Sequence, residues 1–223
     1  MIVAVHQPNY LPYLGFFHKM RRADVLVLYD TAQFVKNEFH NRNRIKTPAG
    51  AGWLTVPVRR QAFAPLKDVE IANERRWAES HLRTIEANYR RAPHFETYFG
   101  ELSGILRRPW SRLADLNAAL IDQAARWLSI GTRVVRASAL PMPPTEDPTG
   151  RLVHLTRAVG GSRYLSGAGG HGYLDESQFT DVRLEYDAFE ARAYPQLFGP
   201  FLPDLSFVDA LLNGGEGAAA LLA

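Results

Sequence analysis

The stretch Ile2-Val3-Ala4-Val5-His6-Gln7-Pro8-Asn9 joins a short apolar run directly to a group of polar side chains. An apolar run of this length is typical of a buried β-strand, and open α/β sheets bind ligands just beyond the carboxyl ends of their strands. We therefore expect His6, Gln7 and Asn9 to follow a strand and to form part of a site.

A second strand follows after one helical segment. Leu14, Phe17 and Met20 recur with helical spacing within residues 10–22, and Val25-Leu26-Val27-Leu28-Tyr29 is a continuous apolar run that ends at Asp30. The order of strand, helix and strand predicts an α/β fold. Together with an edge-strand pattern at 53–58, it predicts a mixed, partly parallel sheet with flanking helices.

The remaining patterns predict a helical middle segment and further strands. We expect helices over 77–89, from Ser111 to before Gly131, over 148–159 with Asp147 as N-cap, and over 207–213; short strands are expected at 69–71, 134–135, 163–165 and 182–186. At 223 residues and 46% hydrophobic content the chain can bury a full core. We expect one domain over 1–223, with a helical sub-region at 73–131.

Composition excludes several mechanisms. The chain contains no cysteine, which rules out disulfides, thiolate metal sites and a cysteine nucleophile. It contains neither an apolar run long enough to span a membrane nor a secretory signal, so we expect a cytoplasmic protein without a membrane partner. No metal-ligand spacing motif is present.

Positive charge is mild but arranged in pairs. The net charge is +3, and arginines stand side by side at 21–22, 59–60, 75–76, 90–91 and 107–108. Such pairs could meet phosphate groups or an acidic carrier protein, or could simply be solvated helix surface. Nucleic acid is a poorer partner, because the charge excess is small and no recognition motif is present.

We interpret the segment from Thr31 to Lys46 as a functional loop, because its side chains are mostly polar and a buried core would not require them. These polar residues include Gln33, Lys36, Asn41, Arg42 and Arg44. If the second half is extended, Asn41 and Asn43 face one side and the two arginines the other. Paired guanidinium groups hold phosphate or carboxylate in bidentate fashion, which suits a nucleotide-activated or phosphopantetheine-bound donor. An exposed surface strand is the equally weighted alternative.

Each candidate also has a structural interpretation. His6 could transfer a proton or grip a polar ligand, or its ring could bond only to backbone. Asp30 could bind a ligand or accept a proton, or it could cap the loop that follows. Ser166 and His171 in the glycine-rich turn could pair as nucleophile and base, but the turn lacks a nucleophile elbow and a phosphate-loop motif, so an ordinary tight turn is at least as well supported.

Five motifs occur in order along the chain: HQPNYLPYLGFFHKM (6–20), ADVLVLYDTAQFVKNEFHNRNRIK (23–46), WLTVPV (53–58), YLSGAGGHGYL (164–174) and YPQLFGPFLPDLSFVDALLNGG (194–215). Together they resemble the WbqC-like family. The resemblance implies a bacterial protein associated with polysaccharide (such as O-antigen) or specialised-metabolite biosynthesis. With the residue analysis, it marks as site-forming His6, Gln7, Asn9, Tyr10, Asp30, Gln33, Lys36, Asn41, Arg42, Arg44, Tyr164, Ser166, Gly167 and Gln196.

These observations predict a transferase that adds an acyl or aminoacyl group to an amine of a sugar-like metabolite. His6 or Asp30 would take the proton of the amine, and Lys36, Arg42 and Arg44 would hold a phosphate-bearing donor or a nucleotide sugar. Two alternatives stay open. One is a nucleotide-dependent enzyme that transfers a nucleotidyl group or activates a carboxylate. The order of strand, turn, helix and strand at the start of the chain is also similar to that of HIGH-type nucleotidylyltransferases and ligases, although their histidine signature is missing. The other is a non-catalytic partner that docks an acyl or peptidyl carrier protein.

Overall fold

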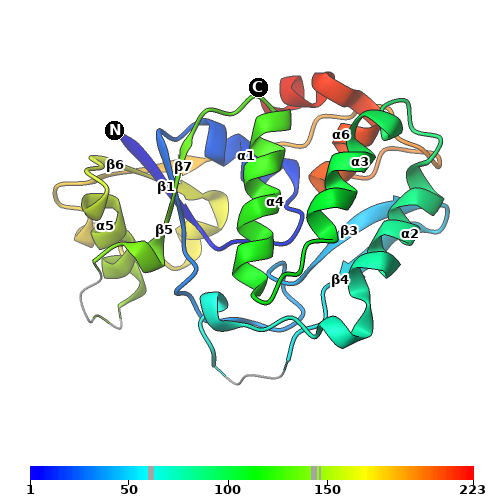
Figure 1. Cartoon of the computed structure of the whole chain (residues 1–223). Coiled ribbons are helices and arrows are strands. Elements are labelled where there is room, and N and C mark those ends of the chain that lie inside the picture. The colour runs from blue at the N-terminus through cyan, green and yellow to red at the C-terminus, as the bar shows by residue number, and fades with distance from the viewer. Residues whose placement is uncertain (60–62, 142–144, 146) are drawn as a thin grey trace.

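The structure, a computed structural model, describes residues 1–59, 63–141, 145 and 147–223 (Figure 1). Arg60, one member of the arginine pair at 59–60, lies outside the described residues. Five parallel strands form the central sheet in the order β5-β2-β1-β6-β7: β1 (Ile2–His6), β2 (Val25–Leu28), β5 (Arg133–Arg136), β6 (Arg163–Gly167) and β7 (Arg183–Asp187). The predicted α/β class is confirmed.

Side-chain alternation along β1 and β2 divides the core into two layers. Val3, Val5, Val25 and Val27 pack with α5 (Pro148–Ala158) on one face of the sheet. The intervening residues pack on the other face with α1 (Leu14–Arg21), α4 (Leu113–Trp127) and α6 (Phe207–Gly214). The continuous apolar runs are explained by this burial on both faces.

A separate hairpin supplies the antiparallel part of the fold. β3 (Arg42–Thr47) pairs antiparallel with β4 (Gly50–Thr55), and neither belongs to the central sheet of the described residues. The loop predicted over 31–46 therefore ends at Asn41, because the backbone after it is paired along its whole length with β4. The predicted mixture of strand directions is real, but it arises between two sheets.

The helical middle segment contains three helices, α2 (Trp77–Tyr89), α3 (Phe95–Leu106) and α4. In Figure 1 α4 lies nearest the sheet, and α3 and then α2 follow away from it. The sequence patterns predicted no separate helix at α3, whose two glycines lie on its exposed face and have low helix propensity. The cap expected from Ser111 does not form, since α4 begins at Leu113 without a side-chain cap. The helix α4 ends before Ser129. It is Ser129, and not the expected Gly131, that has the left-handed backbone conformation after the helix.

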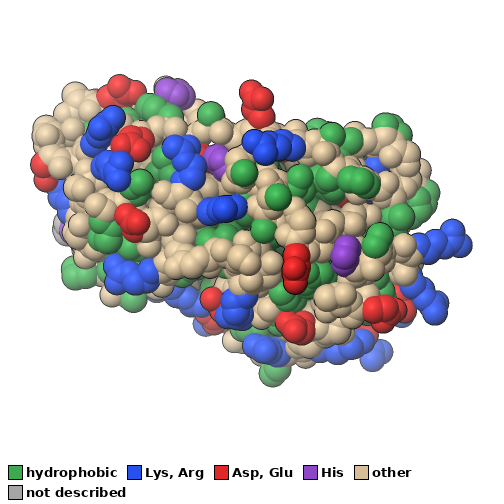
Figure 2. Space-filling view, turned by 90° about the horizontal axis from the view of Figure 1, so that it is seen from above, with side chains coloured by type: hydrophobic (Ala, Val, Ile, Leu, Met, Phe, Trp, Pro, Cys, Tyr) green, Lys and Arg blue, Asp and Glu red, His purple; other side chains and the backbone are tan. Residues whose placement is uncertain are grey.

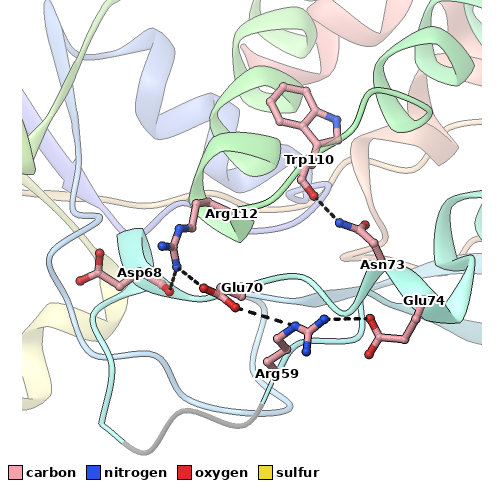
Figure 3. Close-up of polar contacts among 7 residues, drawn as sticks. All are labelled: Arg59, Asp68, Glu70, Asn73, Glu74, Trp110 and Arg112. Atoms are coloured by element: carbon pink, nitrogen blue, oxygen red, sulfur yellow. Dashed lines mark hydrogen bonds and ion pairs between the residues drawn. The ribbon is translucent and has the colours of Figure 1, made fainter.

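Between the hairpin and α2 the chain passes through the 3-10 turns η1 (Leu66–Asp68) and η2 (Asn73–Arg75). The strand expected at 69–71 is reduced to isolated bridges from Glu70 to Arg112 and from Ile71 to Val58. Figure 3 shows what secures this segment: Arg112 reaches the Asp68 carbonyl and the Glu70 carboxylate, and Asn73 donates to the Trp110 carbonyl at 2.7 Å. Polar contacts thus tie the segment to the start of α4.

The second half of the chain follows the expected order. Asp147 caps α5 through the Gly150 amide, with Pro148 as the first helical residue. The turns η3 (Ala137–Ala139), η4 (Ala168–Gly172), η5 (Glu176–Gln178) and η6 (Gly215–Leu222) complete the fold.

No helix within the described part of the chain is long and apolar enough to cross a membrane. On the face seen in Figure 2, positive and negative side chains are interspersed.

Candidate functional site

The strand order places a crevice between β1 and β6. From β1 the chain adds β2 and β5 on one side, then returns to the other side of β1 with β6 and β7. In doubly wound sheets the connections diverge at such a point, and ligands bind beyond the carboxyl ends of the two strands concerned. His6 ends β1 and Gly167 ends β6, so both stand at this point.

Two clefts meet there. The sheet-end cleft, about 560 Å³, is lined among others by Lys19, Tyr164, Gly167 and Gly170. The hairpin-side cleft, about 710 Å³, is lined among others by Asn9, Glu38, His40, Arg44 and Asp204. Both clefts share His6, Gln7 and Tyr13 as lining residues. The residues after β1 therefore form the junction between the two cavities.

The His6 ring is held in one protonation state. Its Nδ1 lies 2.9 Å from the Gln7 carbonyl oxygen, which can only accept, so Nδ1 carries the hydrogen. Burial, and then the charge of Lys19, lower the pKa of His6 to about 3. Phe16 packs edge-on against the ring at 4.8 Å between centroids. The Nε2 atom, without a partner among the described residues, therefore keeps a lone pair for a ligand.

Gln7 is oriented by a relay from the loop before the hairpin. The Val35 amide donates to His40 Nδ1 at 3.2 Å, so His40 Nε2 carries the hydrogen and donates to Gln7 Oε1 at 2.9 Å. With its oxygen engaged, the Gln7 amide nitrogen has no acceptor among the described residues. Asn9, also a lining residue, has a side-chain amide that is unpaired within the same part of the chain. Both amides are available to a polar ligand.

Lys19 lies at the base of the sheet-end cleft. It is buried, and its only hydrogen bond among the described residues runs from Nζ to the Val5 carbonyl at 3.3 Å. Burial lowers the pKa of Lys19 to about 8, an effect that Asp187 opposes. Asp187 itself is paired with Arg22 at 2.6 Å and with His18 at 3.0 Å. A buried lysine without a carboxylate partner is typical of a functional site.

The asparagine and arginine side chains alternate on β3 as the sequence predicts. Asn41 and Asn43 are buried, and the Asn43 amide donates to the Leu11 carbonyl at 2.7 Å. Arg42 and Arg44 lie over the exposed Trp53 ring, at 4.1 and 5.7 Å from its centroid. Arg44 lines the hairpin-side cleft, whereas Arg42 does not. The role of the two arginines as a clamp stays a prediction.

Asp30 does not join the other predicted residues at the clefts. Its carboxylate is buried and accepts from the backbone amide and hydroxyl of Ser138, at 2.9 and 2.6 Å. These contacts differ from the expected cap of the loop after Asp30, because Ser138 follows β5 and lies 108 residues further along the chain. The hypothesis of one cleft shared by His6, Gln7, Asp30 and the asparagine-arginine stretch therefore holds only in part, because the carboxylate after β2 is engaged elsewhere.

Several other predicted residues also lie outside the two clefts. Tyr10 is in the core, where its hydroxyl contacts His81 Nδ1 at 2.8 Å. Lys36 and Asn41 line a third groove beside α2, and Gln33 is exposed beside Pro65. Gln196 bonds to Lys46, Leu202 and Asp209.

The glycine-rich turn does not form the serine-histidine pair. The Ser166 hydroxyl donates to the Gly167 carbonyl at 3.1 Å, while the exposed His171 stacks on Tyr186 at 3.5 Å. A Cβ at Gly170 would lie 2.0 Å from Ser166 Oγ, so only glycine fits there. Tyr164 and Gly167 nevertheless line the sheet-end cleft, and burial raises the pKa of Tyr164.

Sequence reasoning missed four contributors to the clefts. Lys19 was hidden in the basic end of a helix, and Glu38 and Asp204 lie within the motifs at 23–46 and 194–215 but were not marked there as site-forming. Asn117 on α4 is fully buried and donates to the Pro8 and His40 carbonyls, both at 2.8 Å. The one signal in the sequence was that Asn117 is a polar residue within the apolar stripe of a helix. Its two hydrogen bonds link the loop that contains Pro8 to the loop that contains His40.

The strand order defines a doubly wound α/β protein with two clefts at the divergence point of its sheet. The chain belongs to the WbqC-like protein family, whose model matches residues 7–220. It is 34% identical over 223 residues to the uncharacterized protein Rv1507c of Mycobacterium tuberculosis, an alignment that covers 97% of this chain and 95% of that protein. No solved structure matches the chain significantly.

Proposed function

We propose that this protein is a transferase that joins an acyl or aminoacyl group to an amine of a sugar-like metabolite, with His6 Nε2 as the proton acceptor. The observation that carries this proposal is the His6 ring itself. It is neutral, its tautomer is set by the Gln7 carbonyl, and its free nitrogen lies where two clefts meet.

The charges that line the two clefts support a reaction between two different substrates. The hairpin-side cleft contains two carboxylates, Glu38 and Asp204, against one cation, Arg44, and this acidic excess suits a cationic amine on arrival. The sheet-end cleft contains Lys19 and Arg151, and none of its described lining residues is acidic. A donor with an anionic group suits that side. The reacting atoms would then meet at the junction beside His6 and Gln7.

The proposed step balances without an enzyme-bound intermediate. The bound ammonium group first loses one proton to solvent. The neutral amine nitrogen then attacks the carbonyl carbon of the donor, the C–N bond forms, and the C–S or C–O bond to the leaving group breaks. The attacking nitrogen becomes acidic as it gains positive charge, so a weak base suffices to take its proton. His6 Nε2 accepts that proton and passes it to the departing thiolate or phosphate. The Gln7 amide could donate to the carbonyl oxygen.

The test is product formation by mass spectrometry. Acyl-coenzyme A and acyl-carrier thioesters are incubated with nucleotide-linked amino sugars, using wild type, His6→Gln and His154→Gln. His154 is a matched control, because it is an exposed histidine whose Nε2 donates to the Pro141 carbonyl, outside both clefts. We expect His6→Gln to lower kcat by about 10²–10⁴-fold with little change in KM, and His154→Gln to retain wild-type turnover.

Two outcomes would overturn the proposal. Amide formation that survives in His6→Gln within tenfold of wild type would remove the proposed base. Absence of any amide, together with unchanged metabolite production in cells carrying His6→Gln, would favour a non-catalytic partner of a biosynthetic complex.

A second function is favoured by the strand order. Doubly wound parallel sheets that diverge at a central strand commonly bind nucleotides at that point. A nucleotidyl-transfer or carboxylate-activation reaction would use the same clefts and would depend on a nucleoside triphosphate and Mg²⁺. Release of pyrophosphate in the same assay, with no transfer from thioesters, would identify this reaction instead.

A further inference from the structure

We infer that the sheet-end cleft is the binding site for a phosphate group of the substrate, and that Lys19 is the residue that holds it. The inference rests on the proposed function only for the identity of the molecule that carries the phosphate. Lys19 did not stand out in the sequence, and the contacts around it provide the argument.

The first argument is the incomplete pairing of a buried cation. A buried ammonium group is costly unless several acceptors surround it. Lys19 has one, the Val5 carbonyl at 3.3 Å, and forms no ion pair with any residue the structure describes. Lys46, the other buried lysine, has three acceptors: Gln196 Oε1, the Gly199 carbonyl and the Pro200 carbonyl. A bound anion would supply what Lys19 lacks.

The second argument is the character of the cleft around Lys19. Among its described lining residues are a second cation, Arg151, and four tyrosines, while none is acidic. Burial raises the pKa of Tyr13, Tyr164 and Tyr173, so these hydroxyls remain protonated donors. Gly167 approaches closely, since a Cβ there would lie 4.0 Å from Lys19 Nζ. Arg151 Nε already donates to the Thr145 carbonyl, so Lys19 is the cation with acceptors to gain, and the hydroxyl donors beside it suit phosphate.

The third argument links the cleft to His6. The charge of Lys19 lowers the pKa of His6, second only to burial. An anion beside Lys19 would offset that charge and raise the basicity of His6 when the donor is bound. A substrate phosphate would thus both hold the donor and prepare the neighbouring proton acceptor. The site at the divergence point of the sheet would then combine binding and activation.

The test is calorimetric titration of the full chain with inorganic pyrophosphate at pH 7 and low ionic strength. The variants are Lys19→Met, Lys19→Gln and the matched control Lys67→Met, which removes the same charge from an exposed side chain on η1. Wild type and Lys67→Met should bind with affinities within twofold of each other. Both Lys19 variants should bind at least tenfold more weakly while retaining the wild-type circular dichroism spectrum.

Competition identifies the source of the phosphate. ADP, 4′-phosphopantetheine and glucose 1-phosphate are each added against bound pyrophosphate, and the one that displaces it names the substrate class. A nuclear magnetic resonance titration should also show the His6 pKa rising when pyrophosphate is bound in wild type but not in Lys19→Met.

Equal pyrophosphate affinity in wild type and Lys19→Met, or no binding by wild type, would overturn the inference. The inference would also be overturned if none of the three organic phosphates displaced pyrophosphate. The cleft would then be a site for a free inorganic anion and not for a substrate phosphate. Neither result would touch the transferase proposal, which depends on amide formation and on His6. Conversely, loss of the His6 effect with intact pyrophosphate binding would leave this inference standing.

Discussion

The molecule contains a buried polar region and a half-buried one, and they differ in how completely their groups are paired. In the first, which we call the Asp209 network, Asp209 accepts from the hydroxyls of Tyr89 and Tyr194 and from the Gln196 amide, at 2.6 to 2.8 Å. Gln196 in turn accepts from Lys46. In the second, at the junction of the two clefts, His6 Nε2 and the Gln7 amide nitrogen have no partner among the described residues.

This difference distinguishes polar groups that hold the structure together from polar groups that are free to bind a ligand. Buried polar groups that satisfy one another stabilise one arrangement of the chain, and the Asp209 network joins α2, β3 and α6 in this way. Half-buried groups that line a cleft without a protein partner, such as His6 and Gln7, are available to a ligand. The same contrast explains Asp30 and His6, which end neighbouring strands: Ser138 satisfies Asp30, whereas His6 is open on one side.

The largest expected effect is on the Asp209 network. Asp209→Ala would leave two tyrosine hydroxyls and one amide without their shared acceptor, and each such buried group costs about 1–3 kcal/mol. We expect the free energy of unfolding to fall by about 3–5 kcal/mol in urea denaturation followed by circular dichroism. Asp209→Asn keeps one acceptor oxygen and should lose about half as much. A loss below about 1 kcal/mol in Asp209→Ala would contradict the structural role.

A matched pair of lysine variants tests the contrast directly. Lys46→Met should lower the free energy of unfolding by about 2–3 kcal/mol, because two backbone carbonyls lose their donor. Lys19→Met should leave stability unchanged or raise it by about 1 kcal/mol, because it removes a poorly paired buried charge. The sign follows from the pKa of Lys19, lowered to about 8: at pH 7 the charged form is more costly in the folded chain than in the unfolded chain.

The measurement for this pair is urea denaturation at pH 7 with pyrophosphate absent. Equal destabilisation by the two substitutions would remove the distinction between the paired and unpaired regions. It would also show that Lys19 is a structural residue, whatever it binds.

Local patterns in the sequence predicted most of the elements. The apolar runs of β1 and β2, the stripe of α2 and the Asp147 cap of α5 depend on neighbours in sequence, and the structure has them close to the predicted bounds. The order of the strands and the separate hairpin depend on contacts between distant segments. No periodicity encodes them. The helix α3 was missed because Gly100 and Gly104, on its exposed face, lower its helix propensity.

The candidate site was predictable only at its centre. The polar stretch after β1 indicated His6 and Gln7, since no core requires them there. Lys19 has the sequence of a basic helix end, a position where lysine is usually solvated. Its burial comes from packing against β1 and the end of β6, which lies more than a hundred residues further along the chain. Asp30 was ambiguous for the same reason, because Ser138 is equally remote.

The smallest expected effect concerns acid stability. Burial lowers the pKa of His6 to about 3 and that of His81 to about 4, both from 6.5. Between about pH 6.5 and 4 the unfolded chain therefore binds protons that the folded chain does not, and stability falls as the pH falls. Each histidine contributes at most about 1.4 kcal/mol per pH unit to this slope. His6→Gln and His81→Gln should each flatten it.

The two histidines should differ in how they respond to acid, because they belong to the two kinds of region. Both ring nitrogens of His81 are engaged, by Tyr10 at 2.8 Å and by the Thr55 carbonyl at 3.1 Å, so its protonation must reverse the Tyr10 bond, with Nδ1 becoming the donor. His6 can take a proton on its open Nε2 without losing a contact. Nuclear magnetic resonance during acid titration should show His81 charging about one pH unit above His6, because the pKa of His81 is lowered to about 4 and that of His6 to about 3. Charging of His81 should also shift the Tyr10 resonances. Charging of His6 first, in chains that stay folded, would contradict this order of the two pKa values.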